Sequence, residues 1–108
     1  MIYSVDEISQ RIAPVARRYG ILRVYLFGSY ARGEARSDSD VDLLVDETGV
    51  KASGLFQWGG IYDDLAQSLS KKVDLLLLQA LDQPAASALT LSFRKKVREE
   101  MRLIYAAE

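Results

Sequence analysis

Three aspartates, Asp40, Asp42 and Asp74, stand out in this 108-residue sequence as residues whose spacing could support chemistry. Asp40 and Asp42 begin a segment, 40–45, that is typical of a β-strand. Side chains alternate between the faces of a strand, so both carboxylates would point the same way, with their Cα atoms roughly 7 Å apart. Two such carboxylates repel each other unless a cation lies between them, and hard oxygen ligands suit Mg²⁺. The alternative is that the Ser- and Asp-rich residues 37–40 form only a solvated loop.

Asp74 interrupts the apolar segment 72–78, which predicts a strand buried on both faces. An uncompensated carboxylate would be costly to bury there. If this strand lies beside 40–45, Asp74 could join Asp40 and Asp42 in one site for one or two Mg²⁺ ions. An exposed position at the start of the strand, paired with Lys71 or Lys72, explains Asp74 equally well, and spacing alone does not decide between the two.

Gly28 and Ser29 follow directly after residues 21–27, whose β-branched and aromatic composition predicts a strand. Glycine lets the backbone turn sharply and approach a ligand closely. The Ser29 hydroxyl and the N–H groups after it could cradle a phosphate, and Arg32 could add a planar cation for a phosphate oxygen. A plain turn is the commoner explanation of a Gly-Ser pair when it is considered alone.

Three familiar ligand motifs are excluded. Gly28 and Gly33 have the spacing of the P-loop glycines, but Gly33 is followed by Glu34 and Ala35, where this motif requires Lys and then Ser or Thr. The dinucleotide fingerprint fails because Tyr30 stands at its second glycine. An EF-hand calcium loop beginning at Asp38 would place Leu43 at its invariant glycine.

Composition narrows the chemistry further. The chain has no cysteine and no histidine, which excludes thiolate catalysis, Ser-His triads and His-ligated zinc. Its 14 basic and 15 acidic residues argue against a domain that binds nucleic acid by bulk charge. The longest apolar run, 75–78, is far below a membrane span, and the start of the chain lacks the pattern of a secretory signal. We expect a single cytoplasmic domain over residues 1–108.

Helical periodicity surrounds the strands. Residues 4–19 predict a helix with a capping box at Ser4 and Glu7, a kink or restart near Pro14, and a C-cap at Gly20. Residues 54–70 and 85–106 predict two further helices. The order helix, strand, short helix or loop, strand, helix, strand, helix indicates an α/β domain with a small sheet.

Residues 28–46 resemble the signature of the minimal nucleotidyltransferases, a group of the DNA polymerase β-like nucleotidyltransferase superfamily. The shared pattern is an apolar strand, Gly-Ser, ten intervening residues between Ser29 and Asp40, and an Asp-x-Asp flanked by apolar residues. Residues 31–33, Ala-Arg-Gly, also match the minimal group, and Asp74 matches a third acidic residue on a later strand. The resemblance implies a mixed three-stranded sheet flanked by helices.

The resemblance also implies a reaction. The substrate would be ATP or another nucleoside triphosphate with Mg²⁺, which orients the α-phosphate and stabilises the leaving pyrophosphate. Asp40 and Asp42 would hold the metal, and Asp74 would complete the site and accept the proton of the attacking hydroxyl. The triphosphate tail would be bound by four residues: Gly28, Ser29, Arg32 and Gly33.

Members of this group that lack a domain for the acceptor are often the antitoxin partners of HEPN-type helical toxins. The resemblance therefore implies a protein adenylyltransferase that transfers AMP to a tyrosine of a HEPN-type toxin. Two alternatives stay open: a catalytically silent antitoxin that acts by contact, and a transferase for a small molecule such as an aminoglycoside, completed by a partner chain. The sequence does not determine the acceptor, the nucleotide or the oligomeric state. A homodimer is one of the states that it leaves open.

The expected closing helix carries an apolar stripe at spacings of three or four residues. Phe93 and Val97 are expected in the core. Met101 and Tyr105 lie past the last expected strand, so we expect them to remain exposed and to contact a HEPN-type partner.

Overall fold

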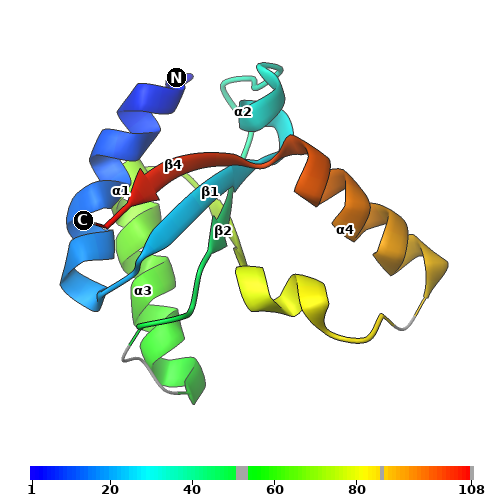
Figure 1. Cartoon of the computed structure of the whole chain (residues 1–108). Helices are drawn as coiled ribbons and strands as arrows, with labels where there is room; N and C mark the ends of the chain where they lie inside the picture. The colour runs from blue at the N-terminus through cyan, green and yellow to red at the C-terminus, as the bar shows by residue number, and fades with distance from the viewer. Residues whose placement is uncertain (51–53, 86, 108) are drawn as a thin grey trace.

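A four-stranded mixed sheet forms the centre of the fold, with helices on both of its faces (Figure 1). The computed structural model describes residues 1–50, 54–85 and 87–107. The strands lie in the order β3-β2-β1-β4, where β2 is parallel to β3 and β1 is antiparallel to both β2 and β4. Their bounds are β1 Arg23–Phe27, β2 Val41–Val45, β3 Val73–Leu77 and β4 Arg102–Ala106.

The first helix follows its predicted signals closely. The helices are α1 Val5–Tyr19, α2 Gly28–Arg32, α3 Gly54–Leu69, the 3₁₀ helix η1 Leu78–Asp82, and α4 Ala88–Glu100. The Ser4 hydroxyl accepts a hydrogen bond from the Glu7 amide, and the Glu7 carboxylate accepts one from the Ser4 amide, so the capping box is confirmed. Gly20 ends α1 in the left-handed conformation. The helix runs through Pro14 without a restart.

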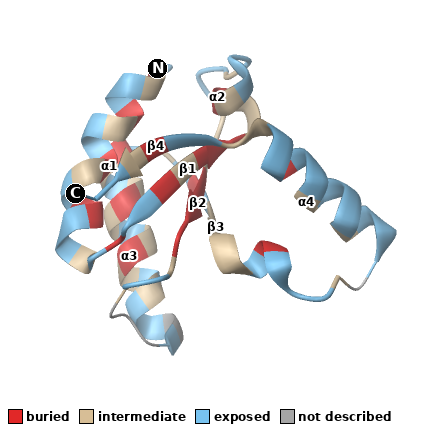
Figure 2. Cartoon of the chain, viewed as in Figure 1, coloured by how far each residue is buried: buried red, intermediate tan, exposed pale blue. Residues whose placement is uncertain are grey.

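One face of the sheet packs on α1 and α3 and forms the main core (Figure 2). Val41, Leu43 and Val45 alternate along β2 and are fully buried against this layer. Burying an aliphatic side chain of this size stabilises the fold by about 1.5 to 3 kcal/mol. The alternation therefore turns the intervening residues, Asp42 and Leu44, to the opposite face.

The opposite face is only thinly covered. Its buried cluster consists of Phe27, Leu44, Leu81 and Val97, contributed by β1, β2, η1 and α4. Val97 is the buried residue of α4, and most of that helix is exposed (Figure 2). Within the described ranges, no helix combines the length and the apolar character that a bilayer crossing requires.

The C-terminal segment differs from its prediction. The expected helix over 85–106 ends at Glu100, and residues 102–106 form β4 against β1, so the sheet has four strands and not three. The edge of β1 offers unpaired backbone groups that a strand can satisfy, and residues 103–105, Leu-Ile-Tyr, are good strand formers. Met101 and Tyr105 are four residues apart, and this spacing also fits one face of a helix, which is why the sequence predicted a helix here.

This correction also removes the helical surface predicted for a partner. Met101 packs against the cluster that contains Leu44, and Tyr105 lies in β4 and packs against the main core. Both side chains are partly buried. They do not form an exposed stripe on a closing helix.

Candidate active site

The register of two parallel strands brings Asp42 and Asp74 together. Asp42 of β2 is the direct partner of Asp74 of β3, and parallel neighbours project their side chains to the same face. On the other side of β2, Asp42 pairs with Phe27, the last residue of β1. Both carboxylates therefore lie on the thinly covered face, next to the turn that follows β1.

The Asp42 carboxyl group holds its proton more firmly than an ordinary aspartate does. The pKa of Asp42 is raised to about 7, first by burial, then by a hydrogen bond with Asp74 and the negative charges of Asp74 and Asp40; Arg32 acts in the opposite direction. A negative charge on Asp42 is difficult to create in a half-buried position beside other carboxylates. A divalent cation bound between Asp42 and Asp74 would relieve this repulsion.

Gly28 allows the Asp42 carboxylate to lie against the backbone. Its φ is +72°, and a Cβ at this position would lie only 1.9 Å from Asp42 Oδ2. Any side chain here would displace the carboxylate as well as strain the backbone. Gly28 also begins the short helix α2, so the turn and helix expected after β1 are confirmed.

A cavity of about 550 Å³ opens between this turn, the strands and α4. Its polar and charged lining residues are Ser29, Arg32, Asp42, Asp74, Lys96 and Glu100. Its apolar lining residues are Phe27, Leu75, Leu76, Phe93 and Val97, with the Phe93 ring edge-on to Phe27 at 6.5 Å between centroids. The cavity therefore combines hard oxygen donors and cations with apolar side chains.

Five of the seven predicted site residues line this cavity, namely Gly28, Ser29, Arg32, Asp42 and Asp74. Asp40 does not line it. Asp40 precedes β2, its side chain is 38% exposed, and Lys72 Nζ lies 4.0 Å from its Oδ2. Gly33 is also outside the lining and instead caps α2 with a φ of +75°. The close carboxylate pair is thus Asp42 with Asp74, and not Asp40 with Asp42.

The fit of this pair to Mg²⁺ rests on its chemistry. Asp42 and Asp74 supply hard oxygen donors, and the raised pKa of Asp42 indicates that its negative charge is unfavourable beside Asp74 without compensation. In the part of the chain that the structure describes, no group of three acidic residues is close enough to form a metal cluster by itself. The pair therefore suits a cation that takes its remaining ligands from phosphate oxygens and water, as Mg²⁺ commonly does.

The sequence reasoning missed the contribution of α4 to this cavity. Arg32 Nη1 donates to both carboxylate oxygens of Glu100 at 3.1 Å, and Lys96 Nζ lies 3.9 Å from Glu100 Oε1. Phe93, Lys96 and Glu100 recur at helical spacing, which was the available signal.

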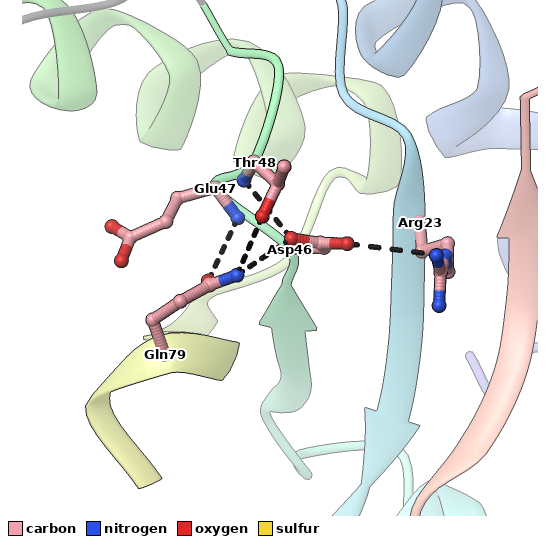
Figure 3. Close-up of polar contacts among 5 residues, drawn as sticks. All are labelled: Arg23, Asp46, Glu47, Thr48 and Gln79. Atoms are coloured by element: carbon pink, nitrogen blue, oxygen red, sulfur yellow. Dashed lines mark hydrogen bonds and ion pairs between the residues drawn. The ribbon is translucent and has the colours of Figure 1, made fainter. Parts of the chain in front are cut away.

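A second polar cluster holds the opposite end of β2 (Figure 3). The buried Asp46 accepts hydrogen bonds from Gln79 Nε2 at 2.8 Å and from the Thr48 amide at 2.9 Å, and Arg23 Nε lies 3.9 Å from its Oδ2. Burial alone would raise the pKa of Asp46, but the bonds from Gln79 and Thr48 and the charge of Arg23 outweigh it and lower that pKa. The cluster fastens the strand end to η1.

A strand that leads into a Gly-Ser helix turn, beside paired carboxylates on two parallel strands, defines the nucleotidyltransferase fold. The family described as polymerase β nucleotidyltransferase matches residues 10–106. Because this match spans most of the 108 residues, the chain belongs to that family.

Two curated relatives carry the name protein adenylyltransferase. MJ0435 of Methanocaldococcus jannaschii, to which this activity is ascribed, is 35% identical over 78 residues, covering 72% of this chain and 82% of its own length. The protein adenylyltransferase MntA of Thermococcus cleftensis is 39% identical over 64 residues, covering 59% of this chain and 63% of that protein.

Solved structures agree on the fold. A structure assigned to the minimal nucleotidyltransferases has a TM-score of 0.65 and 30% identity, covering 93% of this chain and 95% of its own. A toxin–antitoxin structure with AMP-PNP has a TM-score of 0.66 at 22% identity, covering 93% and 74%. The complex of tri-AMPylated Shewanella oneidensis HEPN toxin with MNT antitoxin has a TM-score of 0.61 at 19% identity, covering 95% and 73%.

Proposed function

We propose that this chain is a Mg²⁺-dependent protein adenylyltransferase that transfers AMP from ATP to a tyrosine hydroxyl of a HEPN-type toxin and so acts as its antitoxin. The observation that carries the proposal is the Asp42–Asp74 pair, which lies beside the Gly28-Ser29 turn in one cavity of about 550 Å³. The adenylyltransferase names of two sequence relatives and the HEPN complex among the fold neighbours support the choice of reaction and partner. We expect the protein to act in the cytoplasm, where ATP is available.

The roles of the residues follow from their positions. Ser29 and Arg32 bind the triphosphate in the cavity, where a hydroxyl and a guanidinium offer donors to phosphate oxygens. Asp42 and Asp74 hold Mg²⁺, which takes its remaining ligands from phosphate oxygens and water. When bound, the metal orients the α-phosphate and stabilises the charge of the leaving pyrophosphate.

The transfer itself exchanges one bond for another. The acceptor oxygen forms a bond to the α-phosphorus, and the bond from that phosphorus to the pyrophosphate oxygen breaks. The hydroxyl proton passes to Asp74, which is the more exposed member of the pair. Phe27, Leu76 and Phe93 provide the apolar wall that excludes water beside the nucleoside.

Labelled ATP tests the proposal directly. The chain, Mg²⁺ and a HEPN-type toxin that co-purifies with it should give an AMP-labelled toxin, with label on tyrosine by mass spectrometry. Asp42→Asn and Asp74→Asn should each reduce labelling at least about 100-fold, since metal chemistry commonly supplies several kcal/mol. Asp63→Asn, which changes an exposed carboxylate of α3, is the matched control and should label normally.

Two outcomes would replace the proposal. A toxin that is neutralised without being labelled would indicate a silent antitoxin that acts by contact. Label transferred to an aminoglycoside-type small molecule, and not to the toxin, would indicate a small-molecule transferase completed by the partner chain.

A further inference from the structure

The basic residues of α4 have different surroundings, and one of them belongs to the cavity. Arg94 donates to the carbonyl oxygen of Gln83, and Arg98 forms an ion pair with Asp82 at 2.6 Å, so both fasten α4 to the segment after β3. Lys95 is exposed and lies outside the cavity lining. Lys96 lines the cavity together with Ser29 and Arg32.

Glu100 joins Lys96 to Arg32. Its side chain is only 14% exposed, and its carboxylate accepts two hydrogen bonds from Arg32 Nη1 at 3.1 Å while Lys96 Nζ lies 3.9 Å from Oε1. Two cations that approach the same region repel each other, and a carboxylate between them removes that cost. Glu100 thus holds Arg32 of α2 and Lys96 of α4 close together in the cavity that Asp42 and Asp74 also line.

Glu100 is unexpected at an anion site unless it positions these cations. A negative charge beside a triphosphate is unfavourable by itself, whereas two ordered cations are favourable. The ion pair of Lys96 is loose and its side chain is 64% exposed, so its ammonium can leave Glu100 for a phosphate oxygen without a change in the fold. Among the cavity-lining residues that the structure describes, Arg32 and Lys96 are the cationic ones.

We propose that Lys96 is a second cationic ligand of the triphosphate, and that Glu100 is a positioning residue that holds Lys96 and Arg32 together. This inference rests on the proposed function, because it assigns a residue to the triphosphate end of the same site. It also gives α4 a role, because this helix forms one wall of the cavity and supplies a second positive charge for the β- and γ-phosphates, in addition to Arg32 of α2.

Binding of two probes tests Lys96: a nonhydrolysable ATP analogue with Mg²⁺, and inorganic tripolyphosphate with Mg²⁺, each followed by calorimetric titration of the full chain. Lys96→Met keeps the length of the side chain and removes its charge, and should weaken both probes about tenfold, equivalent to about 1.4 kcal/mol. Lys96→Arg should restore most of the affinity. Lys95→Met removes the same charge from the neighbouring position and should leave both affinities unchanged.

The salt dependence separates a phosphate contact from a structural effect. The affinity of the wild type should fall more steeply between low and high ionic strength than that of Lys96→Met, because one charge contact is missing in the variant. Glu100→Gln should weaken both probes in the wild-type background. It should have less effect in the Lys96→Met background if it acts through that lysine.

The outcomes distinguish the inference from the proposed function. If the wild type binds the probes and Lys96→Met binds them as tightly as Lys95→Met does, the role of Lys96 is overturned and the proposed function stays intact. A Glu100→Gln effect of the same size in both backgrounds would overturn the positioning of Lys96 by Glu100. A wild-type chain that binds neither probe in the presence of Mg²⁺ would overturn the proposed function and this inference together.

Discussion

Replacing Asp42 by Asn should stabilise the metal-free protein, and the gain should depend on pH. The pKa of Asp42 is about 7 in the folded chain, whereas an aspartate of an unfolded chain titrates near 3.9. Between these values the folded protein binds a proton that the unfolded chain has lost. The free energy of unfolding of the wild type therefore falls as pH rises from about 4 to about 7, and it stays low above that range.

The size of this effect follows from the shift and from the exposure of the side chain. Three pKa units correspond to about 4 kcal/mol if the shift is taken in full. Asp42 is only about half buried, so solvent screens its interactions, and a gain of about 1 to 2 kcal/mol is the better expectation for Asp42→Asn at pH 8. Asp74→Asn should also stabilise the protein at this pH, because it removes the negative charge that faces Asp42.

Urea unfolding from pH 4 to pH 8 in the presence of a chelator measures this gain, with the fluorescence of Trp58 as the probe. The difference between Asp42→Asn and the wild type should be near zero at pH 4, grow up to pH 7 and then level off. Asp63→Asn, on the exposed side of α3, should show no such trend. Saturating Mg²⁺ at pH 8 should stabilise the wild type more than Asp42→Asn.

Two results would refute the reasoning. A stability difference that is independent of pH would mean that the pKa of Asp42 is not raised in the folded protein. A variant that is less stable than the wild type at pH 8 would mean that the carboxylate makes a structural contact that outweighs its repulsion.

Three further predictions address the backbone and the packing. Gly28→Ala should abolish AMP transfer and lower the melting temperature more than Gly33→Ala does. A Cβ at Gly28 would meet the Asp42 carboxylate at 1.9 Å, whereas a Cβ at Gly33 would have no atom within 4 Å. Equal melting temperatures of the two variants would contradict this prediction. Asp46→Ala should cost about 1 to 3 kcal/mol at pH 7 in urea unfolding, since buried donors lose their acceptor. Because the folded-state pKa of Asp46 is lowered, this cost should shrink as pH falls below about 4, and a cost that is constant with pH would argue against the charged network. Ile104→Ala should lower the free energy of unfolding by about 2 to 4 kcal/mol and Leu103→Ala by less than about 0.5 kcal/mol, because β4 buries Ile104 and leaves Leu103 54% exposed. The reverse order would contradict the assignment of these residues to a strand.

Local signals in the sequence determined much of the secondary structure of this protein and the identity of most of its site residues. The capping box of Ser4 and Glu7 begins α1, and the alternation of Val41, Leu43 and Val45 identifies β2 and its buried face. The Gly28-Ser29 turn and the carboxylates of the site were also identified from residue type and spacing. These features could be read because each depends on residues close together in the chain, whose preferences act before any long-range contact.

Only the tertiary structure determined which of those residues meet. Asp42 pairs with Asp74 and not with Asp40 because the parallel register of β2 and β3 places the first two side by side, and no local pattern encodes a register between strand residues 32 positions apart. Glu100 reaches Arg32 across 68 positions of sequence because α4 packs against α2.

The last strand shows where local information ends. Residues 102–106 fit a helical stripe and a short strand about equally well, because five residues are too few for the two periodicities to be told apart. The open edge of β1 decides the outcome, since its backbone N–H and C=O groups gain hydrogen-bond partners only if the chain there is extended. That edge exists only once the sheet has formed.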